Sequence, residues 1–264
     1  MENITSKNNE KIKSAIAIRD SASQRKKNGK FFLEGARLCG DAAISGGDIL
    51  QFFFTEKARA KFPEFFEKIL SSAGESYCIS EEVSRKLSDT QSPQGMFCVC
   101  KTGDKNISAD KINHNGKYIL LENVQDPSNL GAVARTAEAM GVDGLIVSGG
   151  CDIYNPKALR ACMGAFFRLN IIECGDIIRF IKSAQAKGMK AFASTPDSEA
   201  VKITEVDFSG GVICIVGNEG NGVTCETMSA ADAKITIPMQ GRAESLNAST
   251  AAAILIWEMV RRGA

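Results

Sequence analysis

The stretch VICIVGNEGNGV, residues 212–223, is the clearest structural signal in this sequence. Its five consecutive apolar residues, Val212–Val216, predict a buried strand, and glycines follow at 217, 220 and 222 with Glu219 between them. Glycine lets a ligand approach the backbone closely. The order of these glycines differs from the G-x-G-x-x-G pattern of dinucleotide-binding sheets, which disfavours a nicotinamide-dependent oxidoreductase. The alternative interpretation is an ordinary glycine-rich turn.

Strands and helices alternate on both sides of this stretch. Downstream, Lys234–Ile237 predicts a short strand and Ser245–Arg262 a long terminal helix. Upstream, the strands Tyr118–Glu122 and Gly144–Val147 flank a helix over Leu130–Met140. Such alternation predicts an α/β fold with a mostly parallel sheet. Ligands bind parallel sheets at the carboxyl ends of the strands, so functional residues are expected in the loops that follow them.

A polar stretch, Thr102–Gly116, separates this region from an apolar-rich N-terminal part and predicts a linker. The N-terminal part has the pattern of a second, small α/β domain, with a helix over Ile12–Lys26 and strands at Lys30–Glu34 and Leu50–Thr55. We therefore expect two domains, residues 1–106 and residues 107–264.

Composition excludes several classes of protein. The chain has 264 residues, of which 44% are apolar and 24% charged, as in globular proteins. Its longest apolar run, Ala251–Trp257, is far shorter than the roughly 20 residues that span a bilayer, and the N-terminus has no apolar signal region. The nine cysteines form no C-x-x-C pair, and His114 is the single histidine. We expect a cytoplasmic protein with reduced thiols, no metal site and no histidine-based catalytic triad.

Positive charge is concentrated at the N-terminal end. Residues 1–31 contain eight Lys and Arg against three Asp and Glu, although the net charge of the whole chain is +1. The basic run Arg25, Lys26 and Lys27 is the candidate contact for a polyanion such as RNA. A solvated helix face is the alternative interpretation.

Two further segments carry candidate functional residues. In NVQDPSNLGAVARTAEAMGVDGLIV, residues 123–147, Asn129 stands at a helix start and Arg135 follows six positions later, on a different side of an ideal helix. In IPMQGRAESLNASTAAAILIWE, residues 237–258, Ser245 and Asn247 stand where the last helix begins. Helix caps are the alternative interpretation for Asn129, Ser245 and Asn247, and a surface ion pair is the alternative for Arg135.

Together these segments resemble motifs 1, 2 and 3 of the SpoU (TrmH-type) RNA 2′-O-ribose methyltransferases, members of the SPOUT superfamily. The corresponding patterns are N-x-x-D-P-x-N-x-G-x-x-x-R, the strand followed by G-x-E-G-x-G, and I-P-M followed by S-L-N. The resemblance extends over about residues 117–262. Residues 22–46 also resemble the family's small RNA-binding domain, which is similar to a ribosomal protein.

The resemblance implies a methyltransferase domain with a deep trefoil knot, a fold that general rules of chain topology would not propose. It implies S-adenosylmethionine as cofactor and no metal. By position, the cofactor-binding residues would be Thr195, Gly217, Ile237, Pro238, Met239 and Leu246. The catalytic residues would be Asn129, Arg135, Glu219, Ser245 and Asn247. It also implies a homodimer formed through the terminal helix and motif 1.

The implied reaction is methylation of a ribose 2′-hydroxyl in RNA. An N-terminal RNA-binding domain favours large-subunit (23S) ribosomal RNA over transfer RNA, and transfer RNA stays as an alternative. A non-catalytic RNA-binding protein with a vestigial cofactor pocket is the other alternative. A guanidinium is a poor base, so Arg135 is expected to steer the phosphate and to stabilise the developing alkoxide.

Overall fold

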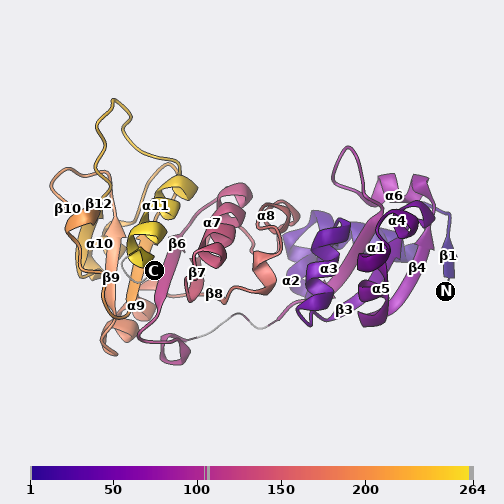
Figure 1. Ribbon diagram of the computed structural model, residues 1–264, viewed down its shortest axis with the longest axis horizontal. Coiled ribbons are helices and arrows are strands. Elements are labelled where there is room, and N and C mark those ends of the chain that lie inside the picture. The colour runs from indigo at the N-terminus through magenta and orange to yellow at the C-terminus, as the bar shows by residue number, and fades with distance from the viewer. Residues whose placement is uncertain (1, 104, 106–107, 262–264) are drawn as a thin grey trace. The chain divides into compact units, whose positions relative to one another are not determined.

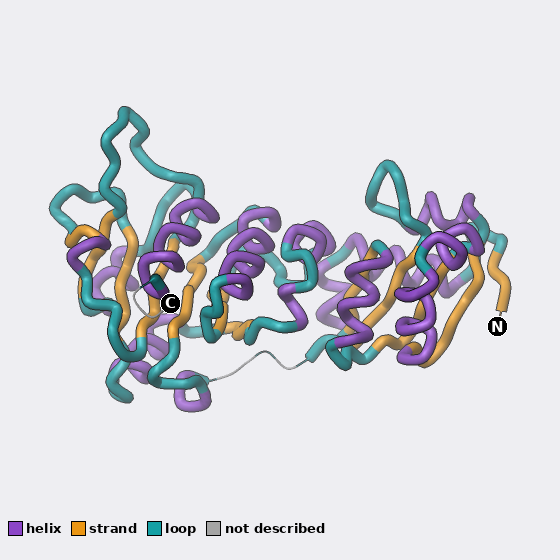
Figure 2. Tube along the Cα trace, in the orientation of Figure 1, coloured by secondary structure: helices purple, strands orange, loops and turns teal. Residues whose placement is uncertain are grey.

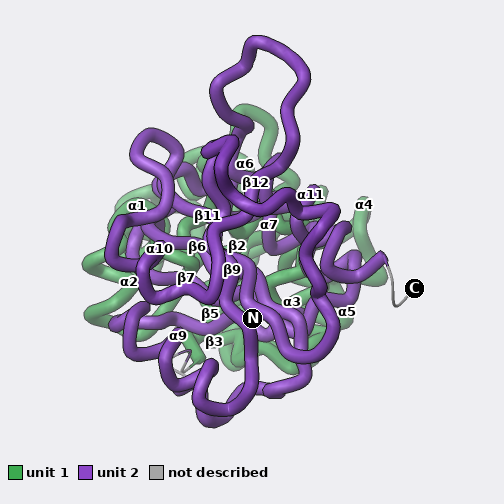
Figure 3. The backbone as a smooth tube through the Cα atoms, turned by 90° about the vertical axis from the view of Figure 1, so that its left-hand side faces the viewer, with its two compact units in different colours: residues 1–103, 152–167 green, residues 104–151, 168–264 purple. Residues whose placement is uncertain are grey.

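A computed structural model describes residues 2–103, 105 and 108–261. The chain divides into two compact units (Figure 3). Unit 1 comprises residues 1–103 and 152–167, and unit 2 comprises residues 104–151 and 168–264. The sequence divides the chain only once, at residue 106. The structure differs from that division because a short segment of the C-terminal half packs within unit 1.

Unit 1 is built on a five-stranded mixed sheet with the strand order β1-β4-β3-β5-β2. Strands β1 and β3 pair parallel with β4, whereas β5 pairs antiparallel with both β2 and β3. Its elements are β1 (Glu2–Ile4), α1 (Glu10–Asp20), α2 (Ala22–Asn28), β2 (Lys30–Glu34), α3 (Ala36–Ile44), β3 (Ile49–Phe54), α4 (Glu56–Lys61), α5 (Pro63–Ser72), β4 (Ala73–Ile79), α6 (Glu81–Leu87), β5 (Met96–Lys101), α8 (Pro156–Ala161) and the 3-10 turn η2 (Ala165–Phe167).

The helix expected over Ile12–Lys26 is two helices. Ser21 interrupts it with an extended backbone, φ −126° and ψ 117°, and its side chain accepts a hydrogen bond from Gln24 N at the start of α2. A serine hydroxyl competes with the helical backbone in this way wherever it can cap a new helix.

Aromatic packing joins segment 152–167 to the rest of unit 1. The ring of Phe31 in β2 lies 4.8 Å from the ring of Tyr154 and 5.9 Å from that of Phe166, measured between centroids. Asp152 accepts a 2.6 Å hydrogen bond from Arg25 Nε, and Arg25 is only 4% exposed. The segment therefore contributes both apolar area and the ion-pair partner of the buried Arg25 to unit 1.

Unit 2 confirms the predicted α/β fold. Its seven-stranded sheet has the order β10-β12-β9-β11-β6-β7-β8, and every pair is parallel (Figures 1 and 2). Its elements are η1 (Ala109–Lys111), β6 (Lys117–Glu122), α7 (Pro127–Ala139), β7 (Gly144–Ser148), β8 (Ile171–Glu173), α9 (Ile177–Gln185), β9 (Lys190–Ser194), β10 (Val201–Lys202), η3 (Ile203–Glu205), β11 (Val212–Val216), α10 (Cys225–Ala230), β12 (Ala233–Thr236) and α11 (Ala248–Val260).

The order of strands in unit 2 reverses beside β6. Strands β6, β7 and β8 follow one another to one edge, whereas β11 lies between β6 and β9. Such a reversal opens a crevice at the carboxyl ends of the two strands that flank it. The loops that begin at Asn123 and Gly217 leave the sheet at this crevice.

Two helix boundaries differ from the expected ones. Helix α7 begins at Pro127 with Asp126 as its N-cap, so Asn129 lies inside the first turn and is not a cap. Helix α11 begins at Ala248, because the Asn247 side chain accepts hydrogen bonds from Ser249 N and Thr250 N as its N-cap. Ser245 and Leu246 consequently belong to the long loop between β12 and α11, which rises from the edge of the sheet in Figure 1. Arg262 lies outside the described residues.

Candidate functional site

A cavity of about 390 Å³ lies at the carboxyl edge of unit 2, where the loops after β9, β11 and β12 meet the start of α11. It is lined by Ser194, Thr195, Pro196, Val216, Gly217, Asn218, Glu219, Gly220, Asn221, Gly222, Val223, Met228, Ile237, Met239, Ser245, Leu246, Ala248 and Ala251. Its size suits a small organic cofactor, since such sites measure roughly 300–1,000 Å³.

The glycine-rich loop after β11 folds back on itself at the wall of this cavity. Asn218 and Gly222 exchange backbone hydrogen bonds of 3.0 and 2.9 Å, and Gly222 has a φ of +68°. A Cβ atom on Gly217 would lie 2.0 Å from the carbonyl carbon of Gly222, so only glycine fits there. The Asn218 side chain stabilises the turn by accepting hydrogen bonds from Gly220 N and Asn221 N. Gly217 is therefore required by the close approach of the loop's own backbone at Gly222, and the approach of a ligand to these glycines stays a prediction.

Glu219 connects this loop to the loop after β6. Its carboxylate accepts hydrogen bonds from Gln125 N at 3.0 Å, Asp126 N at 3.1 Å and Asn129 Nδ2 at 2.9 Å. Partial burial acts to raise the pKa of Glu219, but these hydrogen bonds outweigh it and hold the pKa below its ordinary value. Glu219 is therefore ionised at neutral pH and is a weak base, which suits a positioning residue better than a proton acceptor.

The hydrogen bond from Asn129 continues to the third motif. A carboxylate only accepts, so Asn129 must turn its Nδ2 towards Glu219 and its Oδ1 towards Asn247. Asn247 then donates from Nδ2 to Asn129 at 3.1 Å, and its own Oδ1 accepts from the first turn of α11. One chain of hydrogen bonds, Glu219–Asn129–Asn247, thus joins the three sequence motifs and has a single consistent donor direction.

The cavity gathers most of the residues expected from sequence. Thr195, Gly217, Ile237, Met239 and Leu246 of the expected cofactor set line it, as do Glu219 and Ser245 of the expected catalytic set. Pro238, Asn129 and Asn247 are not part of its lining.

Arg135 lies apart from this group. Its side chain is exposed on α7, is not part of the cavity lining and has no hydrogen-bond or ion-pair partner among the described residues. Helix position explains this, because Asn129 lies inside α7 and six residues along a helix lead to another face. The surface ion pair considered as its alternative role is absent from the described part of the chain.

Sequence inspection missed a buried carboxylate beside the site. Glu122, 6% exposed at the end of β6, accepts hydrogen bonds from Thr224 N at 2.9 Å, Thr224 Oγ1 at 2.8 Å and Thr227 Oγ1 at 2.7 Å. These bonds fix the point where the glycine-rich loop ends and α10 begins. A charged residue closing an apolar strand was the available signal, because a buried carboxylate needs several donors.

The basic run of unit 1 does not act as one surface. Arg25 is buried, and its guanidinium donates to Asp152, Ile18 O and Arg19 O. The expectation that it contacts RNA is corrected for this reason. Lys26 and Lys27 are exposed in the last turn of α2 and stay available to a polyanion.

The described residues include no group of three or more His, Cys, Asp and Glu side chains that could hold a metal ion. All nine cysteines are free thiols. Within the described part of the chain, no helix is both long and apolar enough to cross a membrane.

Comparison with known proteins identifies the family. The model of the SpoU rRNA Methylase family matches residues 116–257, more than half of the chain. This protein belongs to the SpoU rRNA methylase family. Residues 9–98 match a second model, the MRM3-like substrate binding domain.

Relatives of this SpoU protein cover its full length. The 23S rRNA (guanosine(2553)-2′-O)-methyltransferase RlmP of Bacillus subtilis is 29% identical over 98% of this chain and 99% of its own. The 23S rRNA (uridine(2479)-2′-O)-methyltransferase of Streptomyces viridochromogenes is 24% identical over 93% of this chain and 88% of its own. The crystal structure of an AdoMet-bound rRNA methyltransferase from Sinorhizobium meliloti superimposes with a TM-score of 0.87 at 27% identity, covering 99% of this chain and 98% of that one.

Proposed function

We propose that this protein transfers a methyl group from S-adenosylmethionine to a ribose 2′-hydroxyl of RNA, with large-subunit ribosomal RNA as substrate. The observation that carries the proposal is the chain of hydrogen bonds Glu219–Asn129–Asn247 beside the cavity. It brings together polar residues of three distant motifs at the carboxyl edge of a parallel sheet, where ligands bind.

The cavity fits the cofactor. Val223, Met228, Ile237 and Leu246 offer apolar and thioether contacts to a nucleoside, and the Gly217–Gly222 turn brings backbone groups close to it. We assign binding to Thr195, Gly217, Ile237, Met239 and Leu246, with Pro238 setting the backbone between two of them. When bound, S-adenosylmethionine supplies an activated methyl group, so no metal is required.

The polar residues beside the cavity would orient the ribose. Ser245 is an exposed residue of the cavity lining, and Asn247 stands at the start of α11. Glu219 and Asn129 hold Asn247 in one orientation, which aligns the 2′-oxygen for an in-line displacement. With three donors already on its carboxylate and its pKa lowered, Glu219 serves as a positioning residue.

Arg135 would act across a dimer interface. It is exposed on α7 and does not line the cavity of its own chain, and α7 packs against α11. Helix α11 carries Trp257, which is 54% exposed, and the half-buried Ile254. Such exposed apolar area next to a buried helix favours a two-fold contact between copies. We propose a homodimer through α11 and motif 1 in which each site takes Arg135 from its partner.

Three further parts of the proposal rest on family membership. The chain after β12 would pass through an earlier loop to form the trefoil knot. Residues 1–106 would bind RNA through contacts that include Lys26 and Lys27, and residues 107–264 would carry out methyl transfer. Free thiols throughout and a ribosomal RNA substrate both agree with a cytoplasmic location.

Ribosomal RNA is favoured over transfer RNA because the full-length relatives above are named 23S rRNA methyltransferases. One acts on a guanosine and the other on a uridine, so the base is left open here.

Radiolabelled methyl transfer tests the proposal. The protein is incubated with methyl-labelled cofactor and unmodified transcripts of 23S ribosomal RNA, 16S ribosomal RNA or transfer RNA, and Asn247→Ala is the matched inactive control. We expect incorporation into the 23S transcript alone, as an alkali-resistant 2′-O-methyl dinucleotide. Incorporation into transfer RNA alone contradicts the assigned substrate, and none into any RNA contradicts the proposed activity.

A further inference from the structure

Residues 88–95 of unit 1, SDTQSPQG, form an exposed loop between α6 and β5. The loop stands out from the unit in Figure 2 and contains no large apolar side chain apart from the half-buried Pro93. It therefore adds little to the core. Its shape is nevertheless held by side-chain hydrogen bonds at three points, two of which involve charged groups.

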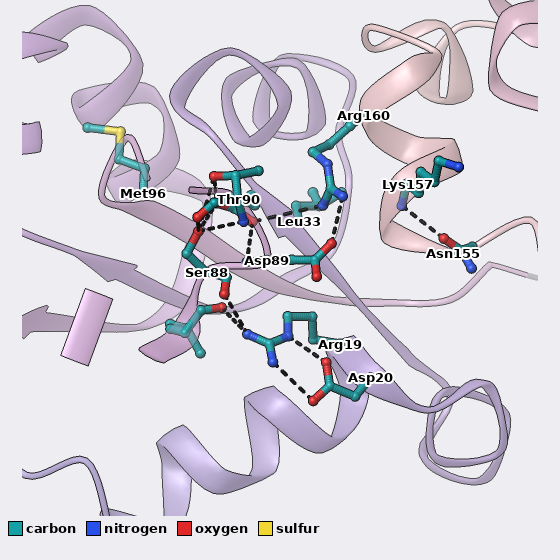
Figure 4. A network of polar contacts seen from close by, with 12 residues as sticks. Arg19, Asp20, Leu33, Ser88, Asp89, Thr90, Met96, Asn155, Lys157 and Arg160 are labelled. Carbon is teal, nitrogen blue, oxygen red and sulfur yellow. Dashed lines mark hydrogen bonds and ion pairs between the residues drawn. The ribbon is translucent and has the colours of Figure 1, made fainter. Parts of the chain in front are cut away.

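The start of the loop is held by Arg19. Its Nη1 donates to Lys86 O, Leu87 O and Ser88 O at 3.1, 2.9 and 2.9 Å, and Asp20 holds the other side of the guanidinium (Figure 4). These carbonyls end α6, where a helix terminus lacks backbone partners.

The middle of the loop is held by a buried carboxylate. Glu34, 7% exposed, accepts from Ser88 Oγ at 2.5 Å, Asp89 N at 3.0 Å and Thr90 Oγ1 at 2.7 Å. Arg160 of α8 lies 3.9 Å from Glu34 and donates to Asp89 Oδ2 at 2.7 Å. Burying such charges is costly unless they are fully paired, so this arrangement fixes a conformation more than it adds stability.

The end of the loop is held by Gln94, whose Oε1 accepts from Ala36 N at 2.8 Å. This bond places the loop against the first turn of α3, where the next residue is Arg37. Arg37 is exposed and has no partner among the described residues.

The tip between these anchors is free to bind. Gln91 and Ser92 are exposed, and neither has a hydrogen-bond partner in the described part of the chain. An amide and a hydroxyl both donate and accept, which matches the edges of unpaired bases. Protein interfaces instead centre on aromatic and apolar side chains, which this loop lacks.

We propose that loop 88–95 reads unpaired bases of the RNA substrate through Gln91 and Ser92, while Arg37 contacts a neighbouring phosphate. The inference rests on the proposed RNA methylation and names a recognition surface for it. A loop that is already held in its bound shape loses little conformational freedom on binding. This gives a reason for the buried Glu34 and for Arg19 and Arg160 to fix the shape of a loop that adds little to the core.

Filter binding with the full-length protein tests this surface. The variants are Gln91→Ala combined with Ser92→Ala, Arg37→Gln, and the control Lys57→Gln. Lys57 is an exposed residue of α4 with no hydrogen-bond or ion-pair partner among the described residues. The probes are an unmodified 23S ribosomal RNA transcript and a poly(A)·poly(U) duplex. The thermal unfolding midpoint confirms that each variant is folded.

We expect the tip variant to bind the transcript about tenfold more weakly or worse and the duplex as well as the unchanged protein, with the same salt dependence. Arg37→Gln should lower the slope of log affinity against log salt by about 0.7–0.9 on either RNA, and Lys57→Gln should change neither measurement. Transcript affinity within about twofold in a folded tip variant, or equal losses on both RNAs, overturns the inference. If the unchanged protein transfers no methyl group, the proposed function fails instead.

Discussion

Asn247 donates a 3.1 Å hydrogen bond to Asn129 Oδ1 across 118 positions of the chain. Because Asn129 also donates to Glu219, its amide has one defined orientation. The start of α11 is therefore aligned with the start of α7 through polar side chains, and each member of the chain of bonds can be tested separately.

Replacing Asn129 by Asp places a second carboxylate against Glu219. We expect methyl transfer at pH 8 to fall by about 10²-fold or more, because two carboxylates now face each other and their repulsion displaces the side chain that accepts from Asn247. The like charge raises the pKa of the new carboxyl, so its protonated form, which donates as the amide does, accumulates as the pH falls. The rate relative to the unchanged protein should therefore rise between pH 8 and pH 5.5. A flat ratio over that range contradicts the mechanism.

Removing the charge of Glu219 should change how stability depends on pH. Its pKa is lower in the folded protein than its ordinary value of 4.5, so its stabilising contribution is present above pH 4.5 and is lost as the pH falls through the folded pKa. The difference in thermal midpoint between the unchanged protein and Glu219→Gln should shrink from pH 6 to pH 3. A difference that stays constant would show that these hydrogen bonds do not depend on the charge.

Glu122→Gln should weaken the link between β6 and α10. The new amide has one acceptor oxygen in place of two and carries no charge, so it cannot accept from Thr224 N and from both threonine hydroxyls at once. The free energy of unfolding should therefore fall by about 1–3 kcal/mol. Urea denaturation measures this loss. Thr224→Ser keeps both donors and is the matched control. Affinity for S-adenosylhomocysteine should fall with Glu122→Gln and hold with Thr224→Ser.

Substitution of Arg25 should lower the stability of the protein, whereas substitution of Lys26 and Lys27 should weaken its binding to RNA. Arg25→Gln removes the ion pair with the partly exposed Asp152 and the hydrogen bonds to two backbone carbonyls, and it should cost about 1.5–3 kcal/mol of stability. The double change Lys26→Gln and Lys27→Gln should leave stability within about 0.5 kcal/mol and reduce the salt dependence of RNA binding. Calorimetry and filter binding separate the two effects. Normal RNA binding by the folded double variant would remove both lysines from the proposed contact.

Mixed dimers test the sharing of Arg135. Arg135→Ala and Asn247→Ala should each be inactive alone. If each site combines Asn247 of one copy with Arg135 of the other, random mixing should restore about a quarter of full activity, since half of the dimers then hold one intact site. No recovery, with dimers present by light scattering, would place Arg135 outside the shared site.

The alternation of strands and helices was predictable because buried parallel strands are apolar runs, as Val212–Val216 and Lys117–Glu122 illustrate. The glycine-rich loop was predictable for a local reason, since the close approach at Gly217 tolerates no side chain. The position of Asn129 inside α7 was not predicted, because the helix begins at Pro127, three residues before the start expected from the sequence at Leu130.

Side-chain contacts between residues far apart in the sequence could not be predicted in either unit. Three consecutive basic residues look alike in sequence, yet Arg25 is buried because Asp152 lies 127 positions away and reaches it only in the folded chain. Glu122 was overlooked for the same reason, since its donors Thr224 and Thr227 are 102 and 105 positions distant.

The packing of segment 152–167 within unit 1 bears on how this protein could be recombined with its relatives. Phe31 packs against Tyr154 and Phe166, so a gene fragment ending at residue 103 would encode a unit without those rings and without Asp152. Chimaeras that exchange unit 1 must therefore transplant two separate stretches of sequence, residues 1–103 and 152–167. The junctions that disturb fewest contacts lie near residues 103, 151 and 168, and a single cut in the linker would leave both halves of the hybrid mismatched.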